Sequence, residues 1–408
     1  MTRCRSALYR LGWVALMRVS AAQAGVWGVD PSVGISGDYS TNPDLFIDPP
    51  PHTAQTHGAV LLNAPTVYNG DATSLSIVPS FRLSDSSGYS SLASDYEHLS
   101  LKGEIDTERS TLTAAATLNQ DSSLYQDYLS DGNTGVKRDT VAADVNWQRF
   151  MTERLSAGAE VNWTQVKYAQ VAGVGTLTNF RDLTISPSLM WNSSERNKIT
   201  FALSASRYTS LDGTTESRSA NAQVGFVHQF SPIWSLEADA GYSRALNRIT
   251  FNEEVLVFLP TGQPAIELVP LNLKSSQNGT IYSVILSRKA ELLTLTLSAS
   301  RQLVPSGFAY LSQQTAAALS VNYTLSERWS LGADARYLRA QDPQLQGGVS
   351  VRTPWSLSGG ASWRWSEHLT ASLNASRVVE HFNPPGATPA SNEVAITFTY
   401  LFNHFKFQ

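Results

Sequence analysis

The residues that could carry chemistry in this chain are seven histidines, one cysteine and many serine, asparagine and acidic residues. The histidines lie at positions 52, 57, 98, 228, 368, 381 and 404, and only His52 and His57 are close together in the sequence. No carboxylate or thiol stands at ligand spacing from this pair, so the pattern predicts no metal site. The cysteine, Cys4, precedes the first apolar run, so we expect neither a catalytic thiolate nor a disulfide framework.

Other catalytic and cofactor signatures are weak. Gly173-Val-Gly175 lacks the strand, the helix and the third glycine of a nucleotide-binding fingerprint, so we interpret it as a loop. No nucleophile elbow is present, although serine, histidine and asparagine could still form a triad that only geometry reveals. Basic stripes for nucleic acid are absent. We therefore expect no cofactor, no nucleic-acid partner and no enzymatic activity, with a hydrolase as an alternative.

The composition favours one large β-structure. The 408 residues suffice for several ordinary domains or for one barrel, and only 16 % of them are charged, below the roughly 25 % of an average soluble protein. Because no run of about 18 apolar residues occurs, a transmembrane helix bundle is excluded. A membrane-spanning β-barrel is not.

Residues 1–24 resemble a secretory signal peptide. Arg3, Arg5 and Arg10 precede a short apolar core, and Ala22-Gln-Ala24 fits the small-residue pattern of a cleavage site. The predicted domains are therefore a signal peptide over residues 1–24 and a β-barrel over residues 25–408.

The stretch from Leu319 to Leu338 shows the pattern that organises the chain. Apolar and polar residues alternate up to Leu325, and after Ser326-Glu-Arg328 the alternation resumes at Trp329. Because side chains alternate across a strand, this pattern predicts a hairpin with one apolar and one polar face.

The same hairpin recurs along the chain. A first strand is predicted over Val29 to Gly37, a proline-rich loop from about Tyr39 to Asp71, a strand over Leu75 to Leu83, and a weak strand around Tyr89 to Asp95. Short turns then follow at Asp106 to Arg109, Thr152 to Arg154, Ser193 to Arg196, Phe230 to Pro232, Arg288 to Lys289, Ser326 to Arg328 and Ser366 to His368. A last strand begins at Val394.

The turns alternate in length. Between the short turns lie longer connections over Ser122 to Lys137, Val171 to Asn179, Asn252 to Leu273, Asp342 to Gly348 and Asn383 to Ser391. This asymmetry is typical of a barrel with short periplasmic turns and long extracellular loops. We predict an all-β, transmembrane, antiparallel up-and-down β-barrel of about 18 strands, or 16 if the strand near Tyr89 is absent.

The apolar face is expected to contact lipid. It carries Leu, Val, Ala and Phe, with tryptophan and tyrosine near the strand ends, as in the aromatic girdles of outer-membrane barrels. A secreted β-helix or sandwich is the alternative, but neither explains the two classes of turn. Phe398, Tyr400, Phe402, Phe405 and Phe407 resemble the aromatic last strand that the barrel-assembly machinery recognises, although Gln408 follows the usual terminal phenylalanine.

Several motifs resemble the beta-barrel porin type 2 family, which is associated with exopolysaccharide loci in Gram-negative bacteria. They are Asp38-Tyr-Ser-Thr-Asn-Pro43, Pro79-Ser-Phe-Arg82, the Thr-Glu-Arg and Ser-Glu-Arg turns, and Leu203-Ser-Ala-Ser-Arg-Tyr208. The resemblance implies a channel in the cell outer membrane, with polysaccharide export as its candidate role. It implies exopolysaccharide and its export machinery as partners, and transfers no catalytic residue.

The polar face is expected to line the lumen. It places ten charged residues there: Arg82, Lys102, Glu104, Asp144, Glu160, Glu237, Asp239, Asp334, Arg336 and Arg364. Six acids against four bases predict weak cation preference or little selectivity. The alternative is that these side chains only hydrate a wide pore.

The sequence allows two structures for one segment. Asn252 to Lys274 is too apolar for an exposed loop, and it predicts either a constriction inside the pore or an extended hairpin that turns at Pro260-Thr-Gly-Gln263. Three functions therefore follow from the sequence: a channel, an outer-membrane hydrolase, or a plugged barrel that binds a partner through its loops.

Overall fold

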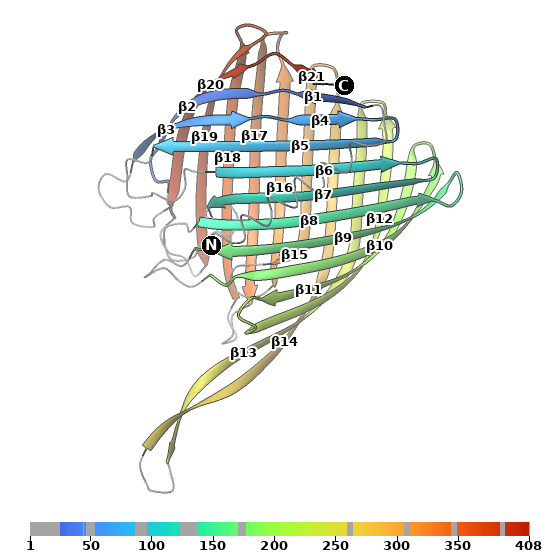
Figure 1. The fold of residues 1–408 in the computed structure, drawn as a ribbon. Coiled ribbons are helices and arrows are strands. Elements are labelled where there is room, and N and C mark those ends of the chain that lie inside the picture. Colours follow the sequence, from blue (N-terminus) through green and yellow to red (C-terminus); the bar gives the residue numbers. More distant parts are fainter. Residues whose placement is uncertain are drawn as a thin grey trace.

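The chain forms a closed antiparallel β-barrel in a computed structural model. Figure 1 shows two walls of strands, the blue and green strands in front and the orange and red strands behind them. The structure describes residues 25–43, 45, 54–85, 96–122, 137–169, 177–258, 264–305, 311–343, 349–383 and 388–407. No helix in these ranges is long and apolar enough to cross a membrane.

Strands account for nearly all of this structure. The first third of the chain contains β1 (Val26–Val29), β2 (Ser32–Ser40), β3 (Gln55–Asn63), β4 (Thr66–Asn69), β5 (Thr73–Asp85), β6 (Tyr96–Asp106) and β7 (Ser110–Ser122). The middle third contains β8 (Lys137–Phe150), β9 (Leu155–Tyr168), β10 (Phe180–Ser194), β11 (Asn197–Ser210), β12 (Thr215–Ser231), β13 (Trp234–Phe258) and β14 (Pro264–Lys289). The last third contains β15 (Leu293–Pro305), β16 (Leu311–Thr324), β17 (Trp329–Pro343), β18 (Val349–Arg364), β19 (Leu369–Asn383), β20 (Ala390–Leu401) and β21 (Phe405–Phe407).

These segments make 18 barrel strands, as the sequence predicted. β1 continues the line of β2, β4 continues β3, and β21 continues β20, since β1 pairs with both β4 and β21 while β2 pairs with both β3 and β20. The barrel closes between the first and last strands, where Ile35 lies opposite Phe398. Every barrel strand therefore has a neighbour on both sides along its barrel portion. In the described ranges, the extended parts of β13 beyond Ile249 and of β14 before Tyr282 pair with each other alone.

One predicted loop is wrong. The segment from Tyr39 to Asp71 contains the whole second barrel strand, β3 and β4, and the first strand is longer than Val29 to Gly37. The predicted strand at Tyr89 to Asp95 lies outside the described residues, and the 18 strands are complete without it.

The loop was predicted because of Pro43, Pro49, Pro50, Pro51 and Pro65. Of these, Pro65 lies in the sheet, in one transverse row with Pro31 and Pro79, where the three prolines act only as acceptors. Pro65 accepts a hydrogen bond from the Asp30 amide, Pro79 from the Ala64 amide, and Pro31 from the Phe402 amide. The breaks between β1 and β2 and between β3 and β4 fall in this row, so proline removes few bonds there.

The two ends of the barrel differ in their connections. At one end, eight turns of two to four residues join the strands, and all seven predicted short turns lie there. We call this the short-turn end; the chain termini of the barrel, β1 and β21, also lie there. At the opposite, long-loop end, the connections have four to fourteen residues. The shortest, Leu211 to Thr214, is an exception to the predicted alternation, and Gly213 takes a φ of 75° in its turn.

The segment Asn252 to Lys274 belongs to the extended hairpin rather than to a constriction. β13 and β14 pair continuously from Trp234↔Arg288 to Phe258↔Pro264. Figure 1 shows this hairpin projecting well beyond the long-loop end of the barrel. The predicted turn at Pro260 to Gln263 lies outside the described residues.

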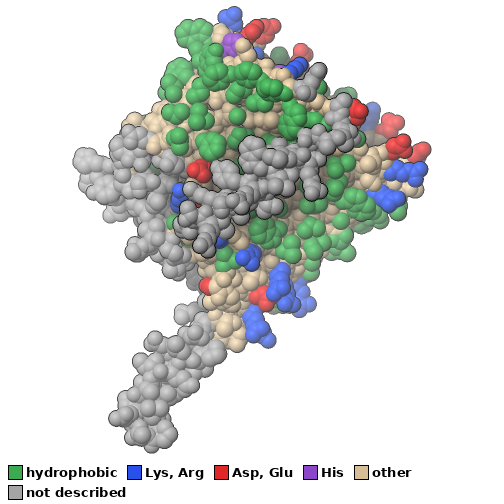
Figure 2. Space-filling view, in the orientation of Figure 1, with side chains coloured by type: hydrophobic (Ala, Val, Ile, Leu, Met, Phe, Trp, Pro, Cys, Tyr) green, Lys and Arg blue, Asp and Glu red, His purple; other side chains and the backbone are tan. Residues whose placement is uncertain are grey.

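The outer surface of the barrel carries an apolar band. Along β10, Leu183, Ile185, Leu189 and Trp191 are 40 to 48 % exposed, while the residues between them face the other way. Figure 2 shows hydrophobic side chains spread over this outer surface between charged groups at its two ends. The alternation predicted from the sequence therefore sorts the side chains onto two faces of the sheet.

One glycine in the wall is needed for close packing. A Cβ atom on Gly241 would meet the backbone carbonyl of Ala222 on the neighbouring strand, whereas a Cβ atom on Gly37 would meet nothing within 4 Å. We expect Gly241→Ala to lower the free energy of unfolding by about 1 to 3 kcal/mol, because a backbone atom yields less readily than a side chain. Gly37→Ala is the matched control, with a change of less than about 0.5 kcal/mol. Denaturant titrations of the two variants in detergent measure the difference, and equal values would contradict the assigned register.

Candidate functional site

The ten charged residues predicted for the lumen all lie on the face of the sheet opposite to the exposed apolar residues. Arg82, for example, lies between Phe81 and Leu83, which are 42 and 54 % exposed. The ten side chains come from β5, β6, β8, β9, β13, β17 and β18, so they are distributed around the wall and do not form one cluster. Only neighbouring strands bring some of them together.

Acidic pairs form on this face in the half near the short-turn end. Asp144 of β8 lies close to Glu160 of β9, and Asp239 lies close to Glu237 on β13. Lys102 and Glu104 form an ion pair of 3.7 Å. The carboxylates Asp144, Glu160, Glu237 and Asp239 outnumber the bases in this half, which gives the face a negative potential there.

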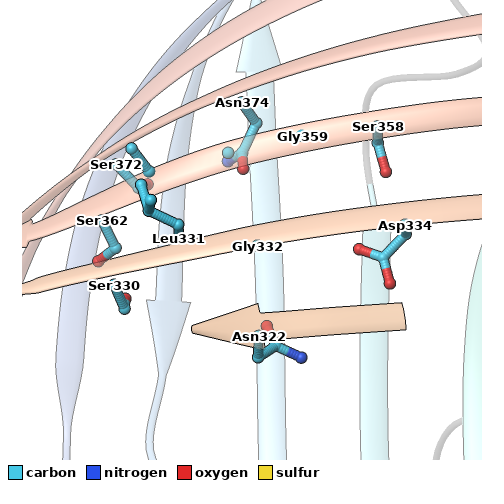
Figure 3. A pocket seen from close by; sticks show the side chains of 12 residues that line it. Asn322, Ser330, Leu331, Gly332, Asp334, Ser358, Gly359, Ser362, Ser372 and Asn374 are labelled. Carbon is cyan, nitrogen blue, oxygen red and sulfur yellow. The ribbon is translucent and has the colours of Figure 1, made fainter. Parts of the chain in front are cut away.

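A concave part of the same face is formed by small polar residues of β16 to β19. Figure 3 shows Asn322, Ser330, Ser358 and Asn374 grouped around Gly332, with Asp334 as the charged member of the group. The lining is completed by Leu331, Gly359, Gly360, Ala361, Ser362 and Ser372. Hydroxyl and amide groups of this kind donate and accept hydrogen bonds with polar solutes.

Ion pairs that the sequence did not predict lie on this face toward the long-loop end. Asp38 is only 8 % exposed and accepts a hydrogen bond of 2.6 Å from Arg82. Arg138 donates two hydrogen bonds to Asp121, at 2.8 and 2.7 Å. Arg352 and Glu380, each 3 % exposed, lie close enough on β18 and β19 for their charges to interact. The sequence did contain a signal for these pairs, because each acid lies on the strand next to that of its arginine or one strand further. Which acid meets which arginine, however, depends on the register of the strands.

An apolar cluster was also missed. It joins Tyr208, which is fully buried, to Leu311, which is 2 % exposed, although four barrel strands separate β11 from β16. Its other members are Val166, Tyr168, Leu177, Phe180 and Ala245, with Leu303 packed against them. The cluster therefore brings distant parts of the wall together and narrows the barrel near its long-loop end. For Val166, Tyr168, Phe180 and Tyr208, the sequence held a signal, because these large apolar residues occupy positions of the polar face.

Beside this cluster, β12, β13 and β14 carry a group of buried neutral polar residues. The side-chain oxygens of Ser217, Asn221, Ser243, Asn247 and Gln277 include atoms that are buried and have no hydrogen-bond partner among the described residues. Cross-strand pairing places Ser217 opposite Asn247 and Asn221 opposite Ser243. Buried polar atoms need a partner, so this group is suited to water or to a polar solute.

The histidines do not form a recognisable catalytic or metal site in the described ranges. His228 hydrogen-bonds Asn197 at 2.6 Å, His404 hydrogen-bonds Asp30 at 2.6 Å, and His368 hydrogen-bonds the Leu401 carbonyl at 3.0 Å. None of these contacts involves a serine hydroxyl. Among the residues that the structure describes, no group of three His, Cys, Asp or Glu side chains could hold a metal ion.

Among known proteins, the chain is similar only to proteins of solved structure, and it shares little sequence with them. No family model matches the chain, and no curated protein matches it. The outer membrane protein opdK of Pseudomonas aeruginosa is 10 % identical, with a TM-score of 0.46, over 92 % of this chain and 99 % of its own. OccK2 (OpdF) of the same organism, solved in complex with glucuronate, is 12 % identical, with a TM-score of 0.45, over 92 % and 98 %. The ferric-catecholate import receptor Fiu of E. coli K12 is 8 % identical, with a TM-score of 0.47, over 91 % and 82 %.

The buried ion pair between Arg138 and Asp121 should couple more strongly than the exposed pair. Their side chains are 10 and 15 % exposed, against 57 and 34 % for Lys102 and Glu104. We expect a double-mutant cycle with Arg138→Ala and Asp121→Ala to give a coupling energy of about 1 to 3 kcal/mol. The same cycle for Lys102 and Glu104 should give less than about 1 kcal/mol, because water screens that pair.

Free energies of unfolding from guanidinium titrations in detergent supply both cycles. Equal coupling in the two pairs would contradict the burial of Arg138 and Asp121.

Proposed function

We propose that this protein is a channel of the bacterial outer membrane. The observation that carries the proposal is a closed 18-strand barrel with an apolar outer band and a polar inner face. In lipid every backbone N–H and C=O group needs a partner within the protein, and a closed barrel satisfies that need with strands. A soluble protein would have to leave many large apolar side chains in water: Leu203 is 61 % exposed and Ile35 is 59 % exposed.

The aromatic residues support a membrane position for the outer band. Trp329 and Tyr337 delimit the outward apolar residues of β17, and Trp363 and Trp355 do the same on β18. At the short-turn end, Trp363 stacks on both Trp329 and Trp365. Tryptophan and tyrosine prefer the two membrane interfaces, so these rings define the borders of the spanning segments.

The connections give the orientation in the proposed membrane. Outer-membrane barrels have short periplasmic turns and longer extracellular loops, so the short-turn end faces the periplasm. Export through the signal peptide of residues 1–24 and insertion by the barrel-assembly machinery, which would bind the aromatic last strand, belong to the same proposal. The likeness to a porin type 2 family is consistent with this position.

The ten predicted charged residues line the lumen in this proposal. The acidic pairs near the periplasmic end attract cations, while the ion pairs near the outer end are close to neutral. Rings of charged side chains select ions, but of these ten residues β8, β9 and β13 contribute only acids while the four bases lie on β5, β6, β17 and β18, so no complete ring of one sign forms. The expected result is a weak cation preference.

Polysaccharide export is the proposed role of the channel, together with an export machinery as its partner. A neutral polar surface supports it, the concave wall of β16 to β19, and the buried serine and asparagine group of β12 to β14 adds neutral polar side chains deeper in the wall. Sugar hydroxyls need many weak donors and acceptors rather than a strong charge. The apolar cluster around Tyr208 narrows the path, which suits a chain that passes in extended form.

Single-channel recording in planar bilayers tests the channel. Folded protein should give discrete current steps, and a salt gradient should give a reversal potential that favours potassium over chloride. Asp144→Asn combined with Glu160→Gln should move this potential toward zero, most clearly at about 0.01 M salt, where screening is weak. Glu153→Gln combined with Glu195→Gln is the matched control, since both acids lie in exposed short turns. The absence of current steps from correctly folded protein would refute the channel.

The same recording tests whether the channel transports polysaccharide. Soluble neutral oligosaccharides should produce transient blocks of the current, and Asn322→Ala combined with Asn374→Ala should shorten them. A pore that conducts ions but shows no block at any length of oligosaccharide would remove polysaccharide from the proposal and leave the channel intact.

The depth of the outer face in lipid can be measured along β17. Ala333 lies midway between Trp329 and Tyr337, so Ala333→Arg should cost about 2 to 4 kcal/mol of folding free energy in phospholipid vesicles. Leu331→Arg lies nearer the interface and should cost less. Ser330→Arg, on the opposite face, is the control and should have little effect. A larger cost for Ser330→Arg than for Ala333→Arg would invert the assigned faces.

A further inference from the structure

A patch of cationic side chains lies on the outer surface where the apolar band ends, at the long-loop end of β10 to β14. Its members are Arg181, Arg207, Arg218, Arg244, Arg248 and Lys274, which are all exposed. Figure 2 shows basic side chains gathered below the hydrophobic surface, near the base of the β13–β14 hairpin. We call this group the arginine patch.

The strand register arranges the patch in rows. Arg207 and Arg218 are directly opposite each other on β11 and β12. Arg248 lies opposite Lys274 on β13 and β14. Since neighbouring strands are about 4.8 Å apart, the patch extends over roughly 20 Å from β10 to β14. Like charges directly opposite each other destabilise a sheet unless a counter-charge is present.

The protein supplies little counter-charge. Glu216 contacts both Arg207 and Arg218, at 2.9 Å in each case. The hydrogen bond from Arg218 is the main cause that lowers the pKa of Glu216, so this carboxylate stays ionised and contributes a single negative charge. Among the neighbouring acids that the structure describes, Asp212 keeps its charge but lies in the β11–β12 turn, where Thr214 binds it, and Asp182 lies on the inner face.

Two other arginines of the patch, Arg181 and Arg248, have neutral partners. Arg181 donates to the Gln165 side chain at 2.8 Å, and Arg248 donates to the Asn272 side chain at 3.2 and 3.1 Å. Such bonds orient a guanidinium group without neutralising it. Among the described side chains, six positive charges therefore face one bound carboxylate within the patch, with Asp212 as a second acid in the turn beside it.

The short-turn end shows the opposite arrangement. Its exposed turns carry acid and base side by side, as in Glu153-Arg154, Glu195-Arg196 and Glu327-Arg328. These turns are neutral by themselves. The excess of positive charge is thus a property of one border of the apolar band and not of the whole surface.

The geometry points to a binding site for the phosphorylated headgroup of a glycolipid in the outer leaflet. The apolar residues directly beside the patch, Leu183 and Leu246, would contact the acyl chains, while the guanidinium groups bind the phosphates. Arginine binds phosphate with paired N–H donors, and a row of arginines at a membrane border attracts anionic lipid. Only a lipid brings both the anionic group and the apolar chains to this border.

This inference depends on the proposed membrane position and orientation, but not on transport. The two can fail separately, because conductance is measured in a neutral phospholipid bilayer that contains no glycolipid. A protein that conducts ions but binds no phosphorylated lipid would overturn only the present inference.

Lipid binding to the purified full-length protein tests the site. Native mass spectrometry in detergent measures the affinity for lipid A with two phosphates, for lipid A with one phosphate, and for phosphatidylglycerol. We expect the affinity to fall in that order. Arg207→Gln combined with Arg218→Gln should weaken binding of the diphosphorylated lipid by about 30-fold, since each charge contributes roughly fivefold.

The matched control is Arg154→Gln combined with Arg196→Gln, which removes two arginines from the short-turn end and should leave the affinity unchanged. If the first variant does not fold, Arg181→Gln combined with Arg244→Gln removes two charges outside the contacts with Glu216. Equal affinity of a patch variant and the unaltered protein would refute the site. Full displacement of the lipid by millimolar inorganic phosphate would also refute it, because the acyl chains would then contribute nothing.

Discussion

The backbone ladder that closes the barrel between β2 and β20 is the constraint on which the rest of the structure depends. Nine residue pairs, from Ser32↔Leu401 to Ser40↔Glu393, join the two ends of the sheet. Without them β2 and β20 would both expose a row of N–H and C=O groups, and each unpaired group in a hydrocarbon environment costs several kcal/mol. Closure removes that cost, and it also fixes the register of every strand, because each strand is held by two neighbours.

A fixed register determines what each face can do. A shift of one residue in any strand would exchange its inner and outer side chains. The apolar band, the inner carboxylates and the arginine patch therefore depend on the same ladder. The one irregularity next to the closure lies at Phe402 to His404, between β20 and β21, where the register shifts by one residue. This register shift lies next to the row of prolines at the short-turn end, after β20 has ended. The inward and outward side chains of β20 therefore keep their alternation.

The alternation of the sequence was enough to predict the barrel and a total of about 18 strands, because these follow from local pattern and turn length. The predicted total counted a strand near Tyr89 and omitted the one formed by β3 and β4, and the extended β13–β14 hairpin was one of two alternatives. The strand within Tyr39 to Asp71 was missed because proline was taken to exclude a central strand. Pro65, the proline of that segment that lies in the sheet, falls in one row with Pro31 and Pro79, and this row is a property of the assembled sheet. The contact between Leu311 and Tyr208 and the pairing of Arg82 with Asp38 could not be predicted for the same reason: both depend on strands far apart in sequence.

The arginines of this barrel show how the surroundings decide whether a charge needs a partner in the protein. On the inner face, Arg82, Arg138 and Arg352 are each matched by a carboxylate, because a narrow, protein-lined space offers few other counter-charges. On the outer face at the same end, Arg207 and Arg218 share a single carboxylate. Consecutive residues of one strand lie on opposite faces: Arg207 is on the outer face, and the next residue, Tyr208, is on the inner face. At the long-loop end the inner arginines therefore face carboxylates while the outer ones are in excess, which is the arrangement expected if an external anion binds the outer face, as inferred above.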